Sequence, residues 1–186
     1  MFNMPAKILL ADDHKLFTDG LQFLLETYGF EVIGAAVNGF DALEKAKQLK
    51  PDIILMDVIM PECTGIEALK LIKAQMPEIK IVMLTTSEED EDLFQAVKLG
   101  ASGYLLKNLN GEDLAEMLSD LENGGAPISP NLAARLLKEF RRGYNPEASM
   151  IDKIDADVGT KLSQRQIEVL EAVSAGRTYK EVGKLL

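Results

Sequence analysis

Polar and charged side chains follow four apolar runs of this sequence, at the points where those runs end. Asp12 and Asp13 follow KILLA, Asp57 follows IILM, Thr85 follows KIVML, and Lys107 follows GYLL. Three carboxylates in one place repel one another, so they need either raised pKa values or a bound cation. A hard divalent ion such as Mg²⁺ takes oxygen ligands and keeps waters and a substrate phosphate. The residue types therefore indicate a site where a carboxylate attacks a phosphoryl group and where metal and ammonium stabilise the added negative charge.

These residues need a parallel sheet to bring them together. From residue 7 to residue 122, five short apolar runs alternate with five amphipathic stretches. This alternation predicts an α/β domain, a five-stranded parallel sheet with helices on both faces. In a doubly wound, flavodoxin-like sheet of order 2-1-3-4-5 the first and third strands are neighbours, and ligands bind at the carboxyl ends of the strands. The three carboxylates then meet at that edge, with Thr85 and Lys107 on the next two strands.

The sequence predicts three segments along the chain. Residues 5–123 form the α/β domain, and the glycines after Asn123 mark its last helix stop. Residues 124–161 form a linker that contains an amphipathic helix near 130–142, opened by a proline at its first position. Residues 162–186 contain two short helices, each preceded by a capping-box pattern.

Composition restricts the classes of partner. The net charge is −10, and residues 1–125 carry 10 basic and 22 acidic side chains. Because phosphate binding depends on Lys and Arg, this excess argues against nucleic acid or anionic membrane as a partner of that region. The sequence has no apolar run of about 20 residues and no signal-peptide pattern, so we expect a cytoplasmic protein without membrane contact. The single cysteine, Cys63, excludes internal disulfides and is expected to be an inert thiol.

The motifs ADDH, LMDVIMPECTG, MLTT and GYLLK, in this order and spacing, resemble the receiver domain of bacterial two-component response regulators. The resemblance covers residues 5–123. It implies that Asp57 is the phosphoacceptor and that Asp12 and Asp13 are the acidic pair for Mg²⁺, with Asp13 and Asp57 as the most direct ligands. It further implies that Thr85 is the switch hydroxyl and Lys107 the phosphate-contacting lysine.

Three further expectations come from the same resemblance. Tyr104 is implied as the switch aromatic, although an aromatic side chain in a strand is by itself more often part of the core. The backbone carbonyl of Ile59 is implied as a metal ligand. A sensor histidine kinase is implied as the donor of the phosphoryl group, and Pro61 and Gly65 also match the receiver pattern.

Residues 162–186, LSQRQIEVLEAVSAGRTYKEVGKLL, resemble the opening of the LuxR/NarL-type helix-turn-helix output domain. In that family a recognition helix follows and enters the major groove. This sequence reaches Leu186 before such a helix, so we expect a truncated output domain whose DNA-binding residues are unknown. The expected function is control of transcription, through a phosphorylation-dependent homodimer that binds DNA with the complete output domain. The alternative is a phosphorylation-dependent protein-interaction module without DNA binding in this 186-residue form.

Other functions fit the residues less well. Aspartate-nucleophile phosphatases of the haloacid dehalogenase type carry a second Asp two residues after the nucleophile, where this sequence has Ile59, so we do not expect an enzyme. A dinucleotide-binding domain needs glycines after its first strand, and this strand ends in ADDH. For His14 a surface or gating position is favoured over a metal ligand, because one histidine makes a poor transition-metal site.

Overall fold

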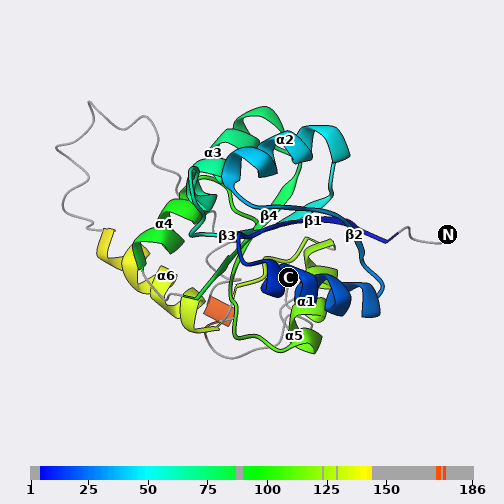
Figure 1. Cartoon of the computed structure of the whole chain (residues 1–186). Coiled ribbons are helices and arrows are strands. Elements are labelled where there is room, and N and C mark those ends of the chain that lie inside the picture. Colours follow the sequence, from blue (N-terminus) through cyan, green and yellow to red (C-terminus); the bar gives the residue numbers. More distant parts are fainter. Residues whose placement is uncertain are drawn as a thin grey trace. The chain divides into compact units, whose positions relative to one another are not determined.

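The structure is a computed structural model that describes residues 5–86, 90–122, 124–128, 130–143, 171–172 and 174. The chain forms two compact units, residues 1–127 and residues 128–186. The first unit contains a parallel five-stranded sheet of order β2-β1-β3-β4-β5, which confirms the predicted fold class and strand order (Figure 1). Its strands are β1 (Lys7–Ala11), β2 (Glu31–Ala36), β3 (Ile53–Asp57), β4 (Lys80–Thr85) and β5 (Gly103–Leu106).

Helices cover both faces of this sheet, as continuous apolar strands require. Figure 1 shows α2 (Gly39–Leu49) and α3 (Gly65–Gln75) on one face and α1 (Lys15–Thr27) and α5 (Gly111–Glu122) on the other. The remaining helix of this unit is α4 (Asp90–Lys98). The face covered by α1 and α5 holds a continuous apolar cluster, to which these helices contribute Leu21, Leu25, Leu114 and Leu118 and the strands contribute Ile8, Leu10, Ile53, Leu55, Val82, Leu84 and Leu105.

The strand register brings the carboxyl ends of the central strands to one level. Ala11, the last residue of β1, is paired with Met56 of β3. The next residues along the two strands, Asp12 and Asp57, therefore lie side by side. Asp57 is paired with Leu84, and Thr85 with Leu106. All five residues of β3 are buried, as expected for the middle of a doubly wound sheet.

The helices of this unit begin and end at residues with local capping chemistry. Thr64 and Glu67 form a reciprocal capping box at the start of α3, in which each side chain accepts a hydrogen bond from the other residue's backbone N–H. At the other end of the unit α5 stops at Glu122, and Gly124 follows with a φ of +90°. Only glycine adopts that conformation at low cost, so the predicted glycine stop agrees with the structure.

The chain after α5 returns to the free edge of β5. The Tyr104 N–H donates a hydrogen bond of 2.8 Å to the carbonyl oxygen of Pro127. A Cβ atom on Gly103 would lie 2.4 Å from the Pro127 ring, so only glycine leaves room for this approach. The edge of β5 is thereby covered, which is one way in which proteins protect exposed strand edges.

In the second unit α6 runs from Pro130 to Gly143, over the residues where the linker helix is expected. The apolar side chains of Leu132, Leu136 and Leu137 lie at helical spacing and are buried. The two helices expected within residues 162–186 lie outside the described residues, except for three helical positions at 171–172 and 174. Across the described parts of the chain, no helix has the length and apolar character needed to cross a membrane.

Candidate functional site

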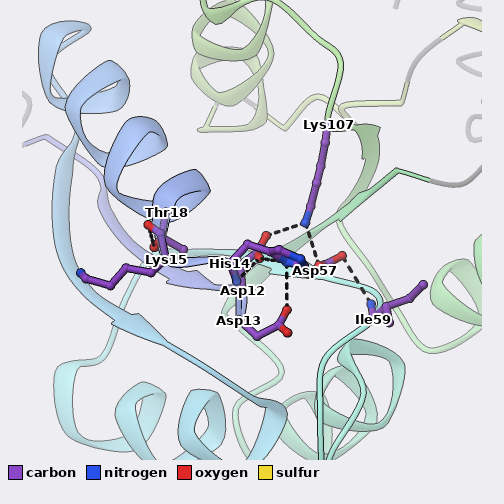
Figure 2. Close-up of polar contacts among 8 residues, drawn as sticks. All are labelled: Asp12, Asp13, His14, Lys15, Thr18, Asp57, Ile59 and Lys107. Carbon is purple, nitrogen blue, oxygen red and sulfur yellow. Dashed lines mark hydrogen bonds and ion pairs between the residues drawn. The ribbon is translucent and has the colours of Figure 1, made fainter.

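The predicted site residues meet at the carboxyl edge of the sheet. Asp12 directly follows β1, Asp57 and Thr85 are the last residues of β3 and β4, and Lys107 directly follows β5. Because these four strands are adjacent in the sheet, side chains up to 95 positions apart in the sequence come within hydrogen-bonding distance (Figure 2). The tertiary fold thus assembles one polar site from four strand ends.

Lys107 joins two buried carboxylates at the centre of the site. Its Nζ atom lies 2.6 Å from Asp12 Oδ2 and 2.7 Å from Asp57 Oδ2 (Figure 2). The exposed fractions of the three side chains are 10% for Lys107, 4% for Asp12 and 7% for Asp57. Charged groups this deeply buried are stable only when they are paired, and here one ammonium serves both carboxylates.

The electrostatic balance of the site is negative. Burial raises the pKa of Asp57; the Lys107 ammonium opposes this rise and the neighbouring Asp12 charge adds to it. Burial alone would lower the pKa of Lys107, but its hydrogen bonds to Asp12 and Asp57 and the charges of both carboxylates raise that pKa overall. The lysine therefore stays charged, and the carboxylates around it still outnumber the positive charge that it supplies.

Asp13 and His14 lie at the solvent side of the same cluster. His14 Nδ1 is 3.1 Å from Asp13 Oδ1 and 3.2 Å from Asp12 Oδ1 (Figure 2). The Asp13 side chain is 36% exposed and the His14 side chain 71% exposed. The acidic pair therefore divides into a buried carboxylate that contacts Lys107 and a half-exposed carboxylate that faces solvent.

These groups fit a divalent cation. Ligand atoms of Asp12, Asp13, His14 and Asp57 all lie within 4.8 Å of one another, and they form the only such group of three or more among the described residues. Three carboxylates are oxygen donors of the kind that hard cations select. A cation here would offset the negative charge that Lys107 leaves unbalanced, so the donor set suits Mg²⁺.

The loop after β3 contacts the phosphoacceptor candidate through Ile59. The Ile59 N–H points at Asp57 Oδ1 across 3.4 Å, and the Ile59 side chain is 63% exposed. Its apolar side chain brings no acid or base to the mouth of the site. The role of its carbonyl as a metal ligand stays a prediction.

Thr85 and Tyr104 are both buried, each with 1% exposure. The carbonyl oxygen of Thr85 accepts a 2.8 Å hydrogen bond from the Lys107 N–H, so the backbone joins the hydroxyl candidate to the lysine. Tyr104 lies on β5 in register with Met83 of β4, and among the described residues it is the largest fully buried side chain. Tyr104 therefore occupies a core position in this structure, and a movement of its ring would have to displace packed neighbours.

Two residues that sequence reasoning did not single out for a role also shape the site. The Lys107 ammonium lies 4.7 Å above the centre of the Phe17 ring, a cation–π contact that helps hold the lysine over the carboxylates. In the sequence, the place of Phe17 in the first helical turn after Asp12 and Asp13 is the feature that indicates a position near the site. Gly65 begins α3, and a Cβ atom there would lie 1.9 Å from the Asp57 carbonyl oxygen. Gly65 thus lets α3 pack directly against the end of β3.

Comparison with known proteins gives one consistent family. Residues 8–119 match the response regulator receiver domain. The chain is 37% identical over 186 aligned positions to the transcriptional regulatory protein LnrK of Bacillus subtilis, an alignment that covers 97% of this chain and 82% of LnrK. It is 33% identical over 180 positions to the response regulator protein VraR of Staphylococcus saprophyticus, covering 96% of this chain and 80% of VraR.

Solved structures agree with the sequence matches. A two-component response regulator of the LuxR family from Aurantimonas sp. SI85-9A1 superposes with a TM-score of 0.69 at 28% identity, over 74% of this chain and 99% of the other. A DNA-binding response regulator of the LuxR family from Staphylococcus aureus superposes with a TM-score of 0.60 at 26% identity, over 62% of this chain and 98% of the other. The likeness therefore covers the fold of the unit that carries the site.

Proposed function

This chain belongs to the two-component response regulators of the LuxR/NarL type, and from this premise we propose that Asp57 accepts a phosphoryl group from the phosphohistidine of a sensor histidine kinase. The observation that carries the proposal is the buried Asp57 carboxylate, held 2.7 Å from Lys107 within a cluster of acidic groups. Receiver domains form a signalling family and not a family of catalytic enzymes. The exposed Ile59, in place of a general acid, agrees with that assignment.

The transfer is a substitution at phosphorus. A carboxylate oxygen of Asp57 forms a bond to phosphorus while the bond from phosphorus to the donor imidazole breaks, and the electron pair of that bond leaves with the imidazole nitrogen. The product is an acyl phosphate on Asp57, which carries one more negative charge than the carboxylate. Lys107, already adjacent to Asp57, is placed to donate a hydrogen bond to the new phosphoryl oxygens.

Mg²⁺, when bound by Asp12, Asp13 and Asp57, supplies positive charge to the phosphoryl oxygens. Asp12 has a second task, because its Oδ2 atom holds the Lys107 ammonium at 2.6 Å. Asp13 is the most exposed of the three carboxylates, which suits a ligand at the open side of the site. The Ile59 carbonyl completes the proposed ligand set.

The same residues support a conformational switch. We assign the Thr85 hydroxyl to the new phosphoryl group, since Thr85 ends the strand beside Asp57 and its carbonyl already binds the Lys107 backbone. Tyr104 lies on the next strand and is the switch aromatic in this proposal. The Tyr104 N–H holds the carbonyl of Pro127, so a change in β5 would reach the segment that leaves the receiver unit.

The proposed output is control of transcription. A relative named as a transcriptional regulatory protein aligns with 97% of this chain, and a similar solved structure is described as DNA-binding. We propose that phosphorylation favours a homodimer and that DNA is bound through a complete helix-turn-helix output domain. Transcription in bacteria takes place in the cytoplasm, which gives the proposed location. A phosphorylation-dependent protein-interaction module is the alternative for the 186-residue form.

The test is phosphorylation of the purified chain with acetyl phosphate and MgCl₂, followed by intact-mass spectrometry. We expect a mass gain of one phosphoryl group that is lost on treatment with hydroxylamine, as an acyl phosphate should be. The gain should be absent in Asp57→Asn. Asp52→Asn is the matched control, because Asp52 lies just before the opposite end of β3 and binds the Lys7 N–H. An unmodified wild-type chain, or equal modification of Asp57→Asn, would overturn the proposal.

A further inference from the structure

His14 is the one chemically active side chain at the site that the phosphorylation mechanism leaves without a role. It is also the only histidine of the chain. Its Nδ1 atom faces the oxygen atoms of both members of the acidic pair, at 3.1 Å from Asp13 Oδ1 and 3.2 Å from Asp12 Oδ1 (Figure 2). In the absence of metal these contacts are a hydrogen bond and ion pairs between the ring and the two carboxylates, and they hold Nδ1 at the metal site although one histidine in the sequence favoured a surface position.

These spacings match the edges of a metal coordination shell. Adjacent ligands of an octahedral ion with bonds near 2.1 Å are about 3.0 Å apart, and opposite ligands about 4.2 Å apart. The two contacts of His14 Nδ1 are close to the shorter of these values, and the whole group including Asp57 lies within 4.8 Å. Small shifts of the side chains would therefore place Nδ1 and three carboxylate oxygens around one cation.

We propose that His14 Nδ1 is a ligand of the divalent cation at this site, and that it gives the site a preference for a transition-metal ion such as Mn²⁺ over Mg²⁺. The inference rests on the proposed function, since it adds a residue to the metal site used there. Carboxylates and waters suit both Mg²⁺ and Mn²⁺, but Mn²⁺, although the weakest binder of the first-row transition-metal series, accepts an imidazole nitrogen more readily than Mg²⁺ does. Facing two carboxylate oxygens without metal, Nδ1 is the hydrogen-bond donor; it offers a lone pair to a cation in the other tautomer, with the ring proton on Nε2.

The local backbone fixes His14 in place without help from its ring. His14 is the N-cap residue of α1, yet its side chain makes no capping hydrogen bond. Its N–H donates to Asp12 Oδ1 at 2.9 Å, and its carbonyl oxygen accepts from the N–H groups of Phe17 and Thr18. A substitution of this exposed ring therefore removes the nitrogen and keeps the backbone that holds the site.

The direct test is pulsed electron paramagnetic resonance of Mn²⁺ bound to the tag-free chain labelled with ¹⁵N-histidine. Because the chain contains a single histidine, any coupling of Mn²⁺ to ¹⁵N belongs to His14. We expect a coupling of the size found for a directly bound imidazole, and its loss in His14→Ala. Bound Mn²⁺ without ¹⁵N coupling would overturn the inference and leave the proposed function standing. Failure of both MnCl₂ and MgCl₂ to bind would contradict the proposed function itself.

Calorimetric titration with MnCl₂ and MgCl₂ gives the second readout. We expect His14→Ala to lose about tenfold in Mn²⁺ affinity, the lower end of losses seen when a metal site loses a partner, and to change little toward Mg²⁺. Lys15→Ala is the matched control, because Lys15 is the next residue, is 85% exposed and pairs with Asp19 outside the site. It should leave the ratio of the two affinities unchanged. An equal change toward both ions in His14→Ala, or tighter binding of both, would show that His14 only competes for the carboxylates.

Discussion

Asp and Lys side chains lie at both the amino and the carboxyl edge of the sheet, but their partners differ between the two edges. At the amino edge two charged side chains bind backbone groups: Asp52 accepts from the Lys7 N–H at 2.8 Å, and the Lys80 ammonium donates to the Leu121 carbonyl at 2.7 Å. At the carboxyl edge Asp12 and Asp57 share the single ammonium of Lys107, with Asp13 beside them.

The charged side chains of the amino edge hold segments of the fold together, whereas those of the carboxyl edge give the site an excess of negative charge. The two contacts at the amino edge tie strands to neighbouring segments, and the two side chains, Asp52 and Lys80, carry opposite charges. The carboxyl edge keeps more negative charge than its lysine can balance, which costs stability unless a cation or a change of protonation offsets it. Such local costs are typical of functional sites.

The largest effect should come from Lys107→Met. Removing one partner of a buried charge pair costs about 3 kcal/mol or more, because the remaining charge has no counter-ion. We therefore expect the free energy of unfolding to fall by about 3 kcal/mol without metal and to recover in part with MgCl₂, which replaces the missing positive charge. Urea denaturation with and without MgCl₂ measures both quantities.

Lys80→Met is the matched change at the amino edge. It removes one charged hydrogen bond to a carbonyl oxygen, so we expect a loss of about 1–2 kcal/mol that does not respond to MgCl₂. An equal response of the two variants to MgCl₂ would remove the distinction between the edges.

The next effect concerns the packing beneath the site. Gly65→Ala places a Cβ atom 1.9 Å from the Asp57 carbonyl oxygen, and because that oxygen belongs to the backbone, the end of β3 or the start of α3 must move. We expect a loss of about 2–3 kcal/mol, in the range of overpacked cores, together with slower phosphorylation by acetyl phosphate. Thermal unfolding and the phosphorylation rate measure the two effects.

Gly20→Ala is the control for Gly65→Ala. Gly20 lies within α1, and a Cβ atom there meets no other atom within 4 Å. Alanine is the better helix former, so we expect a gain of about 0.5–1 kcal/mol and an unchanged rate of phosphorylation. A similar loss in both glycine variants would mean that the effect is not specific to the contact with Asp57.

The smallest effect is the pH-dependent change in the free energy of unfolding that Asp57→Asn causes. Burial raises the pKa of Asp57 in the folded chain, so its contribution to stability is full at acidic pH, below its unfolded pKa, and is lost as the pH rises through the raised value. Without metal we therefore expect Asp57→Asn to be more stable than the wild type at pH 7. This difference should shrink as the pH falls toward about 4, the ordinary range of an Asp carboxyl. Urea denaturation at several pH values measures this difference in stability. A difference that does not change with pH would contradict the expectation that ionised Asp57 destabilises the fold.

Much of the fold follows from local pattern. The continuous apolar runs predicted five parallel strands, and β3 with its five buried residues is the clearest case. The glycine stop after α5 was predicted from Gly124, which takes a φ of +90°. Thr64 and Glu67 carry a capping-box pattern in the sequence as well, and it marks the start of α3.

The sequence by itself determined which residues stand at the strand ends, since the period of the apolar runs sets where each strand stops. Only the tertiary structure decided which of those residues are buried, which are exposed and which contact one another. Burial and register placed Lys107 between Asp12 and Asp57, left Asp13 half exposed, and turned His14 toward both members of the acidic pair. The physical reason is that distance and burial set the interaction of charges, and neither quantity is encoded in the spacing of residues along a chain.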